Sequence, residues 1–147
     1  MNKRTANKGE WSELYVFFKI VLDRIVYAAD ANMVPKRDEW FKFIKLYKSI
    51  NNGKSLIYDL TDEKIVKIHH SKTEIEIVDE LNLRQTVTTI LDTIKKQKST
   101  FAVQDAGVLM NAYSIDTVKA KSISKSDIDA DVIVSNNTGI HRMGFSV

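Results

Sequence analysis

Apolar residues recur every three or four positions along two long segments of the chain, the spacing at which side chains share one face of an α-helix. The first segment predicts a helix over residues 10–29, and its stripe consists of Trp11, Leu14, Phe18, Val21, Leu22 and Ile25. Asn7 precedes this helix and Glu10 follows three residues later, which is the spacing of a capping box. The second segment predicts a helix over residues 80–96, and its stripe consists of Leu83, Val87, Ile90, Leu91 and Ile94.

Alternating apolar and polar residues, separated by turn signals, predict strands in much of the remaining chain. The segment "WFKFIKLYKSI-NNGK-SLIYDL" predicts a hairpin, because Asn-Asn-Gly favours a tight turn between two strands. A shorter helix is predicted over residues 104–113. Further strands are predicted over residues 63–70, 73–78, 115–122, 128–135 and 142–147, the last two joined by the turn "NNTG". The expected fold class is α+β, with helices packed on a mostly antiparallel sheet.

The chain has 147 residues, a length that suits a single domain with one hydrophobic core. It contains no cysteine, which excludes disulfides, thiolate catalysis and cysteine-ligated zinc. No apolar run approaches the roughly 20 residues of a membrane-spanning helix, and the basic first residues lack the apolar core of a signal peptide. With no phosphate-binding loop or dinucleotide fingerprint, we expect a cytoplasmic protein with no organic cofactor and no membrane partner. The net charge of +3 permits a polyanionic partner without requiring one.

Three aspartates alternate near the carboxyl end of the sequence, in the segment "KSDIDADVIVSNNTGIHRMGFSV". Asp127, Asp129 and Asp131 are predicted to share one face of a strand. Three carboxylates on one face repel one another unless a cation or water lies nearby, and carboxylate oxygens suit Mg²⁺. The segment therefore predicts either a Mg²⁺ site or an edge strand whose acidic outer face prevents aggregation.

Two other groups of residues have a plainer structural explanation. Aromatic residues alternate with lysines over residues 40–48, a mixture found in nucleic-acid grooves and equally in core strands with solvated lysines. His69 and His70 are adjacent, so they point to opposite faces of a strand and do not suit one metal site. His141 lies near the acidic strand, where we expect an exposed loop position.

Both ends of the chain resemble one family of nucleases. The opening "NKGEWSELYVFFKI…YAADAN" is similar to the opening of HpaII-type restriction endonucleases, in which a "KGEWSE" helix is followed by "LYAAD". The closing "SKSDIDADVIV…NNTGIHRMGFSV" looks like the core hairpin of the PD-(D/E)xK nuclease superfamily, and the HpaII-type sequences continue with "GFSxKS". The middle of the chain matches only in its pattern of strands and one long helix. The resemblance implies a partial restriction-endonuclease-like core.

The resemblance also implies hydrolysis of a phosphodiester with Mg²⁺ as cofactor, the ion polarising the scissile phosphate and activating a bound water. Asp127 would be the principal metal ligand. Asp129 and Asp131 are alternatives, because one sequence does not fix the alignment. Ser146 would occupy the position at which most of the superfamily has an acidic residue.

In such nucleases a helix near the amino terminus often adds a glutamate to the metal site. Glu13 and Glu10 are the candidates, one turn apart on the same side of the predicted helix, although capping explains Glu10 and surface charge explains Glu13. The lysine expected of the superfamily would follow Val147 directly, where the sequence stops. We therefore expect residues 1–147 to be a single domain or the amino-terminal fragment of a longer nuclease, one that binds Mg²⁺ weakly and does not cut DNA by itself.

The implied partner is double-stranded DNA, cut by a type II restriction endonuclease at a short palindrome such as CCGG. A homodimer would suit the two-fold symmetry of such a site. Two alternatives stay open on the sequence: a non-enzymatic α+β module that binds DNA or protein, and a PD-(D/E)xK nuclease with another role such as repair. In the first alternative the acidic strand is only an exposed edge.

Overall fold

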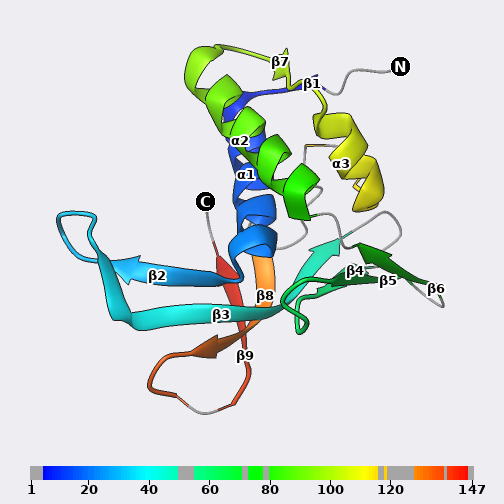
Figure 1. Cartoon of the computed structure of the whole chain (residues 1–147). Coiled ribbons are helices and arrows are strands. Elements are labelled where there is room, and N and C mark those ends of the chain that lie inside the picture. Colours follow the sequence, from blue (N-terminus) through cyan, green and yellow to red (C-terminus); the bar gives the residue numbers. More distant parts are fainter. Residues whose placement is uncertain are drawn as a thin grey trace.

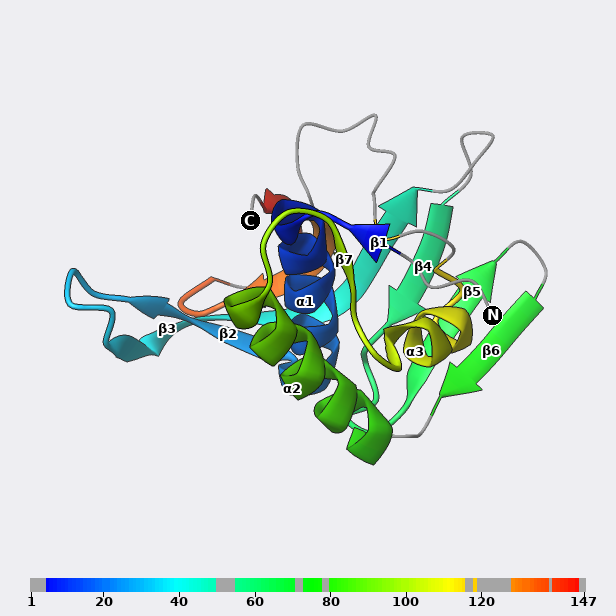
Figure 2. The same ribbon diagram turned by 90° about the horizontal axis from the view of Figure 1, so that it is seen from above.

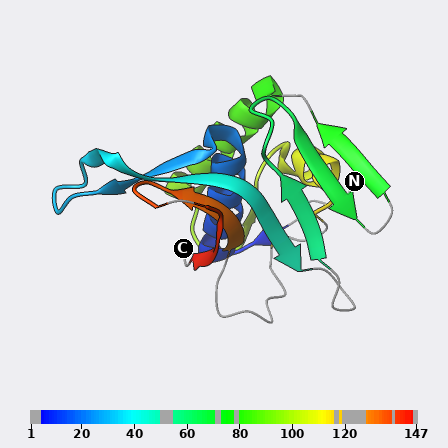
Figure 3. The ribbon, with the colours of Figure 1, turned by 90° about the horizontal axis from the view of Figure 1, so that it is seen from below.

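A computed structural model of the chain describes residues 5–49, 55–70, 73–77, 80–115, 118, 128–137 and 139–145. The helices lie together on one side of a twisted antiparallel sheet, which confirms the predicted α+β class (Figure 1). Figure 3, seen from below, shows the sheet in front of the helices. In the described part of the chain, no helix has the length and apolarity needed to cross a membrane.

The described elements follow one another in a simple order. They are β1 (Thr5–Ala6), α1 (Lys8–Asp23), β2 (Ile25–Ala29), β3 (Pro35–Ser49), β4 (Ser55–Asp59), β5 (Val66–His70), β6 (Thr73–Ile77), α2 (Glu80–Lys96), β7 (Phe101–Ala102), α3 (Ala106–Ala112), β8 (Ile128–Val134) and β9 (His141–Phe145). The large sheet has the strand order β6-β5-β4-β3-β8-β9, with β2 also paired to β3, while β1 and β7 form a separate small sheet. Seen from above, α1 and α2 lie side by side and α3 lies over β4, β5 and β6 (Figure 2).

The capping box at the start of α1 is confirmed. The side chain of Asn7 accepts a hydrogen bond from the backbone N–H of Glu10 at 2.9 Å, and the Glu10 carboxylate accepts one from the backbone N–H of Asn7 at 3.1 Å. Two of the backbone donors exposed at a helix start are thereby satisfied. The buried stripe matches most of the predicted one and consists of Trp11, Leu14, Phe17, Phe18, Ile20 and Val21.

The predicted extension of this helix to residue 29 is wrong. The helix ends at Asp23, and Ile25–Ala29 forms strand β2. Arg24 adopts the left-handed backbone conformation, with φ of 67°, and its N–H caps the helix by donating to the Ile20 carbonyl at 2.8 Å. Beyond this reversal the β-branched Ile25 and Val26 favour an extended chain, which pairs with β3 instead of adding another helical turn.

The side chain of Arg24 joins the end of α1 to the chain beyond β4. Its Nε donates to the Val21 carbonyl at 2.6 Å, and its Nη1 donates to the carbonyls of Leu60 at 2.7 Å and Asp62 at 2.8 Å. The Arg24 carbonyl accepts a bond from the N–H of Phe43 in β3 at 2.8 Å. One residue therefore fixes the helix end both to β3 and to the segment that follows β4.

Strand β3 is the central strand of the sheet. One of its edges pairs with β8, while the other pairs first with β2 and then with β4. The predicted hairpin of β3 and β4 is confirmed over the rungs from Lys45–Asp59 to Ser49–Ser55, but the strand begins earlier than expected, at Pro35. Proline suits the first position of a strand, since no ladder donor is lost inside it.

Apart from one strand, the other predicted elements are confirmed within a few residues. Strands β5, β6, β8 and β9 and helices α2 and α3 lie where the pattern predicts them. The strand predicted over residues 115–122 lies outside the described residues except for Ile115 and Val118, which are in no strand. The small sheet of β1 and β7 was not predicted, because two residues carry no periodic signal.

Aromatic rings hold α1 to the sheet. The ring of Phe17 packs edge-on against Tyr58 of β4 with centroids 5.0 Å apart, and Phe18 packs in the same way against Tyr113 at 5.2 Å. The Tyr58 hydroxyl donates to the Tyr113 carbonyl at 2.6 Å, and burial raises the pKa of Tyr58. Near the helix start, the indole N–H of Trp11 donates to the carbonyl of Phe101 at 2.9 Å. The polar atoms of these buried rings are therefore satisfied while their apolar surfaces fill the core.

We predict that Arg24→Met lowers the free energy of unfolding by about 2 kcal/mol, because the partly buried hydrogen bonds to the Val21 and Leu60 carbonyls lose their charged donor. Lys19→Met is the matched control, since Lys19 makes only an exposed ion pair with Asp23 in the same helix. It should change stability by less than about 0.5 kcal/mol. Urea unfolding of the two variants makes the comparison. Equal losses in both would show that the Arg24 contacts do not hold the helix to the sheet.

Candidate active site

The hairpin of β8 and β9 carries the predicted acidic residues. Asp129 pairs with Gly144, and Asp131 pairs with Arg142. Ile128, Ala130 and Val132 are buried beneath the helices, so Asp129 and Asp131 lie on the opposite, outer face, as the alternation predicts. Both aspartates are half-buried.

The last described rung of this hairpin pairs Ile128 with Phe145. Asp127 and Ser146, the predicted metal ligand and its counterpart, lie outside the described residues. Asp127 directly precedes Ile128 in the sequence, and Ser146 directly follows Phe145. The rung therefore marks the end of the hairpin to which both predictions refer.

Asp131 is fully engaged by two neighbouring side chains. Its Oδ1 accepts a bond from Arg142 Nε at 2.5 Å, and its Oδ2 accepts one from the Tyr47 hydroxyl at 2.6 Å. Partial burial by itself would raise the pKa of Asp131, but the hydrogen bonds from Arg142 and Tyr47 outweigh it and hold that pKa below its ordinary value. Asp131 is thus a charged carboxylate whose two oxygens already have protein donors.

The Asp131–Arg142 pair is one end of a row of alternating charges that crosses the outer face of the sheet. The pairing registers place side by side, from β9 to β6, Arg142, Asp131, Lys45, Asp59, Lys67 and Glu76. We call these six residues the charge row. Opposite charges on adjacent strands stabilise a sheet by about 0.2–1 kcal/mol a pair. The row also explains how the outer face carries carboxylates without net repulsion.

The two glutamates of α1 have different environments. Glu10 is committed to the capping box with Asn7. Glu13 lies one turn further along, where its charge acts on Lys48 at the end of β3. The Lys48 ammonium lies 5.6 Å from the centre of the Phe17 ring. Burial lowers the pKa of Lys48, and the Glu13 carboxylate opposes that shift.

The histidines make no metal cluster with these groups. Within the described ranges, no three His, Cys, Asp or Glu side chains are grouped closely enough to hold a metal ion. His69 Nδ1 lies 3.9 Å from a carboxylate oxygen of Glu74, and both side chains are partly exposed. His141 is exposed at the start of β9. Among the aromatic residues of the 40–48 segment, Phe43 is buried in the core, while Trp40 and Tyr47 are half-buried.

Sequence reasoning missed Arg142, Tyr47 and Lys48 as partners of the predicted site residues. Tyr47 and Asp131 are 84 positions apart in the sequence, and no local pattern predicts that β3 pairs with β8. The one usable signal was the hairpin itself: antiparallel pairing across the "NNTG" turn places some residue of β9 opposite each aspartate, and a cation there is a natural partner.

The charge row allows a test of pH dependence at Asp59. Burial opposes the lowering of the Asp59 pKa, but two hydrogen bonds from Thr61 and the charges of Lys45 and His69 hold it below its ordinary value. A lowered carboxyl pKa adds stability above the unfolded pKa, about 3.9, which is lost as pH falls through the folded pKa. Asp59→Asn should therefore flatten the loss of stability between about pH 5 and about pH 2.

The measurement is urea unfolding as a function of pH, with an NMR titration of the Asp59 carboxyl. Thr61→Val should move the Asp59 pKa upward, toward its ordinary value, because it removes the hydroxyl donor at 2.6 Å. Thr88→Val is the control, since its hydroxyl donates to a helix carbonyl instead. A normal or raised Asp59 pKa in the unaltered protein would contradict this assignment.

The chain was compared with family models, curated proteins and solved structures. No curated protein and no solved structure matches the chain significantly. A family model does match, over residues 7–147, which includes the capped helix α1, the whole sheet and the β8–β9 hairpin. It describes the HpaII restriction endonuclease, a family whose name indicates a type II restriction endonuclease. The chain belongs to the HpaII restriction endonuclease family.

Proposed function

We propose that the protein is a type II endonuclease that hydrolyses double-stranded DNA at a short palindrome, with Mg²⁺ as cofactor. Membership of the HpaII restriction endonuclease family is the observation that carries this proposal. The resemblance implies a short palindrome, and CCGG is the first such sequence to test. A homodimer is part of the proposal, since two copies related by a two-fold axis can cut both strands of a palindrome.

We place the metal site at the end of the sheet marked by the Ile128–Phe145 rung. Asp127, the residue before Ile128, is the proposed principal ligand. Asp129 would support it, because it lies on the outer face of β8 opposite Gly144, next to the Ile128–Phe145 rung. The proposed donors are the carboxylates of Asp127 and Asp129 and the hydroxyl of Ser146. Such oxygen donors suit Mg²⁺, so these residues fit the ion. When bound, the ion would lower the pKa of a water and stabilise charge on the scissile phosphate.

Glu13 is the better of the two candidates from α1. The Glu10 carboxylate already accepts the Asn7 backbone N–H, whereas Glu13 lies toward Lys48 at the end of β3. Tyr47, the residue before Lys48, pairs with Asp129, so the end of β3 lies next to the start of β8. Glu13 lies on the helix side of the sheet and Asp129 on the outer side. Lys48 and Tyr47 are adjacent in β3, which supports a shared site at the end of the sheet.

Asp127→Asn in the complete gene product should lower Mg²⁺-dependent cleavage of CCGG-containing plasmid by at least about 100-fold, since a neutral amide is a poor Mg²⁺ ligand. Binding to the same DNA, measured with Ca²⁺ in place of Mg²⁺, should change little. Glu74→Gln is the control, because Glu74 is an exposed carboxylate on β6 near the opposite edge of the sheet. Sequence-specific binding without cleavage by the unaltered protein would favour the non-enzymatic module instead.

Substitutions of Glu13 and Glu10 should have different effects on cleavage and on stability. Glu13→Gln should lower cleavage by about 10-fold to 100-fold, the range for a residue that supports a metal ligand. Glu10→Gln should leave cleavage nearly unchanged and cost at most about 1 kcal/mol of stability, because it weakens the capping box only. Cleavage assays and thermal unfolding of both variants give the answer. Equal cleavage by both would remove Glu13 from the site.

A further inference from the structure

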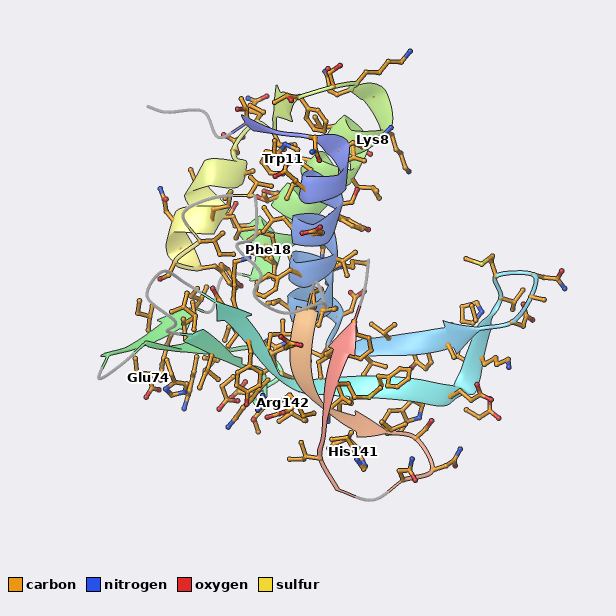
Figure 4. The ribbon with its side chains drawn as sticks, turned by 180° about the vertical axis from the view of Figure 1, so that it is seen from behind. Lys8, Trp11, Phe18, Glu74, His141 and Arg142 are labelled. Carbon is orange, nitrogen blue, oxygen red and sulfur yellow. The ribbon has the colours of Figure 1, made fainter. Side chains whose placement is uncertain are left out.

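Three residues from three adjacent strands form one polar unit on the outer face of the sheet. Tyr47 of β3 and Arg142 of β9 both bond to Asp131 of β8, and each uses a different carboxylate oxygen. The Arg142 guanidinium also lies over the Tyr47 ring, with its central carbon 3.8 Å from the ring centre. Figure 4 shows Arg142 on the side of the sheet away from Trp11 and the helices.

This unit fixes the orientation of an exposed arginine. Asp131 and the Tyr47 ring hold the guanidinium from its edge and from one face. The bond to Asp131 uses Nε, so the edge formed by the two terminal nitrogens is not consumed by the ion pair. The Arg142 side chain is 59% exposed, against 17% for Asp131. Because the orientation of the guanidinium is already fixed, the Arg142 side chain loses little conformational entropy when its two terminal nitrogens bind a second anion.

The charge around this arginine suits an incoming phosphate. Asp131 lies between Arg142 and Lys45 in the charge row, so two cations flank one carboxylate there. Lys42, which pairs with Ile133 of β8, adds a further partly exposed cation on β3. An arginine fork matches the geometry of a phosphate group, with which it can form two parallel hydrogen bonds.

We propose that Arg142 binds a backbone phosphate of double-stranded DNA, with Asp131 and Tyr47 as its positioning residues. This inference rests on the proposed function and deepens it. Arg142 lies three residues before Phe145 in β9, which is about 10 Å along an extended strand from the proposed metal site. The contact is therefore a phosphate outside the scissile one. Asp131 acts on Arg142 in this arrangement and leaves metal binding to Asp127 and Asp129.

The test is fluorescence anisotropy of a labelled CCGG-containing duplex bound by the complete gene product, with Ca²⁺ in place of Mg²⁺, over a series of salt concentrations. Arg142→Gln should weaken binding by about 10-fold and reduce the slope of log K against log salt by about 0.9, the value for one phosphate contact. Arg142→Lys should keep most of the slope but recover only part of the affinity, because lysine lacks the fork. Arg37→Gln is the matched control, since Arg37 also stacks on a tyrosine, Tyr27, in β2.

Variants of Asp131 and Tyr47 test whether these two residues position Arg142. Asp131→Asn should weaken DNA binding in the unaltered background and add almost nothing to Arg142→Gln, because both changes break one unit. Tyr47→Phe keeps the ring and loses the hydroxyl, so it should give a smaller effect of the same kind. Circular dichroism confirms that each variant is folded.

Two outcomes would overturn the inference. One is an affinity and salt slope for Arg142→Gln equal to those of the unaltered protein or of Arg37→Gln. The other is an Asp131→Asn variant that binds DNA normally but needs far more Mg²⁺ for cleavage, which would make Asp131 a metal ligand. Both leave the proposed endonuclease standing. An unaltered protein that neither binds nor cuts the duplex would instead refute the proposed function.

Discussion

The fold depends on the reversal of the chain at Arg24. A left-handed backbone at this one residue ends α1 and sends the chain into β2, and the same residue bonds to Phe43 in β3. Its side chain then holds the carbonyls of Leu60 and Asp62 beyond β4. Because β3 pairs with β2, β4 and β8, fixing α1 to β3 also sets where the helix start lies relative to the β8–β9 hairpin. The relation of Glu13 to the end of the sheet follows from this junction.

Local sequence patterns predicted most helices and strands well, but they predicted poorly how these elements pair and contact one another. The capping box of Asn7 and Glu10 and the stripes of α1 and α2 depend on residues within a few positions, so the sequence displays them directly. The extension of the first helix to residue 29 failed for the same reason: Leu22 and Ile25 continue the helical spacing, and the left-handed Arg24 that breaks it has no sequence signature. Non-glycine residues adopt that conformation infrequently, and here the side-chain bonds of Arg24 to Val21, Leu60 and Asp62 hold it there.

In the candidate site too, the local pattern was predictable and the contacts between strands were not. Alternation correctly placed Asp129 and Asp131 on one face of β8, but it made them equivalent. The structure distinguishes them, since Asp131 accepts hydrogen bonds from Arg142 and Tyr47, whereas Asp129 lies opposite Gly144 in β9 and Tyr47 in β3. That difference is set by strand order and register, which join residues 84 positions apart. Charge pairing across the sheet then explains why the carboxylates of the outer face are stable without a metal at each of them.

We propose that a divalent metal binds at the end of the sheet marked by Ile128 and Phe145. Paramagnetic broadening of backbone amide NMR signals by Mn²⁺, which substitutes for Mg²⁺ at carboxylate sites, locates such an ion directly. The broadening should be steepest at Ile128 and Phe145, weaker at Arg142, and weakest at Glu74 near the far edge of the sheet. Broadening centred on Arg142 or Glu74, or none above the background of free Mn²⁺, would contradict the proposed site.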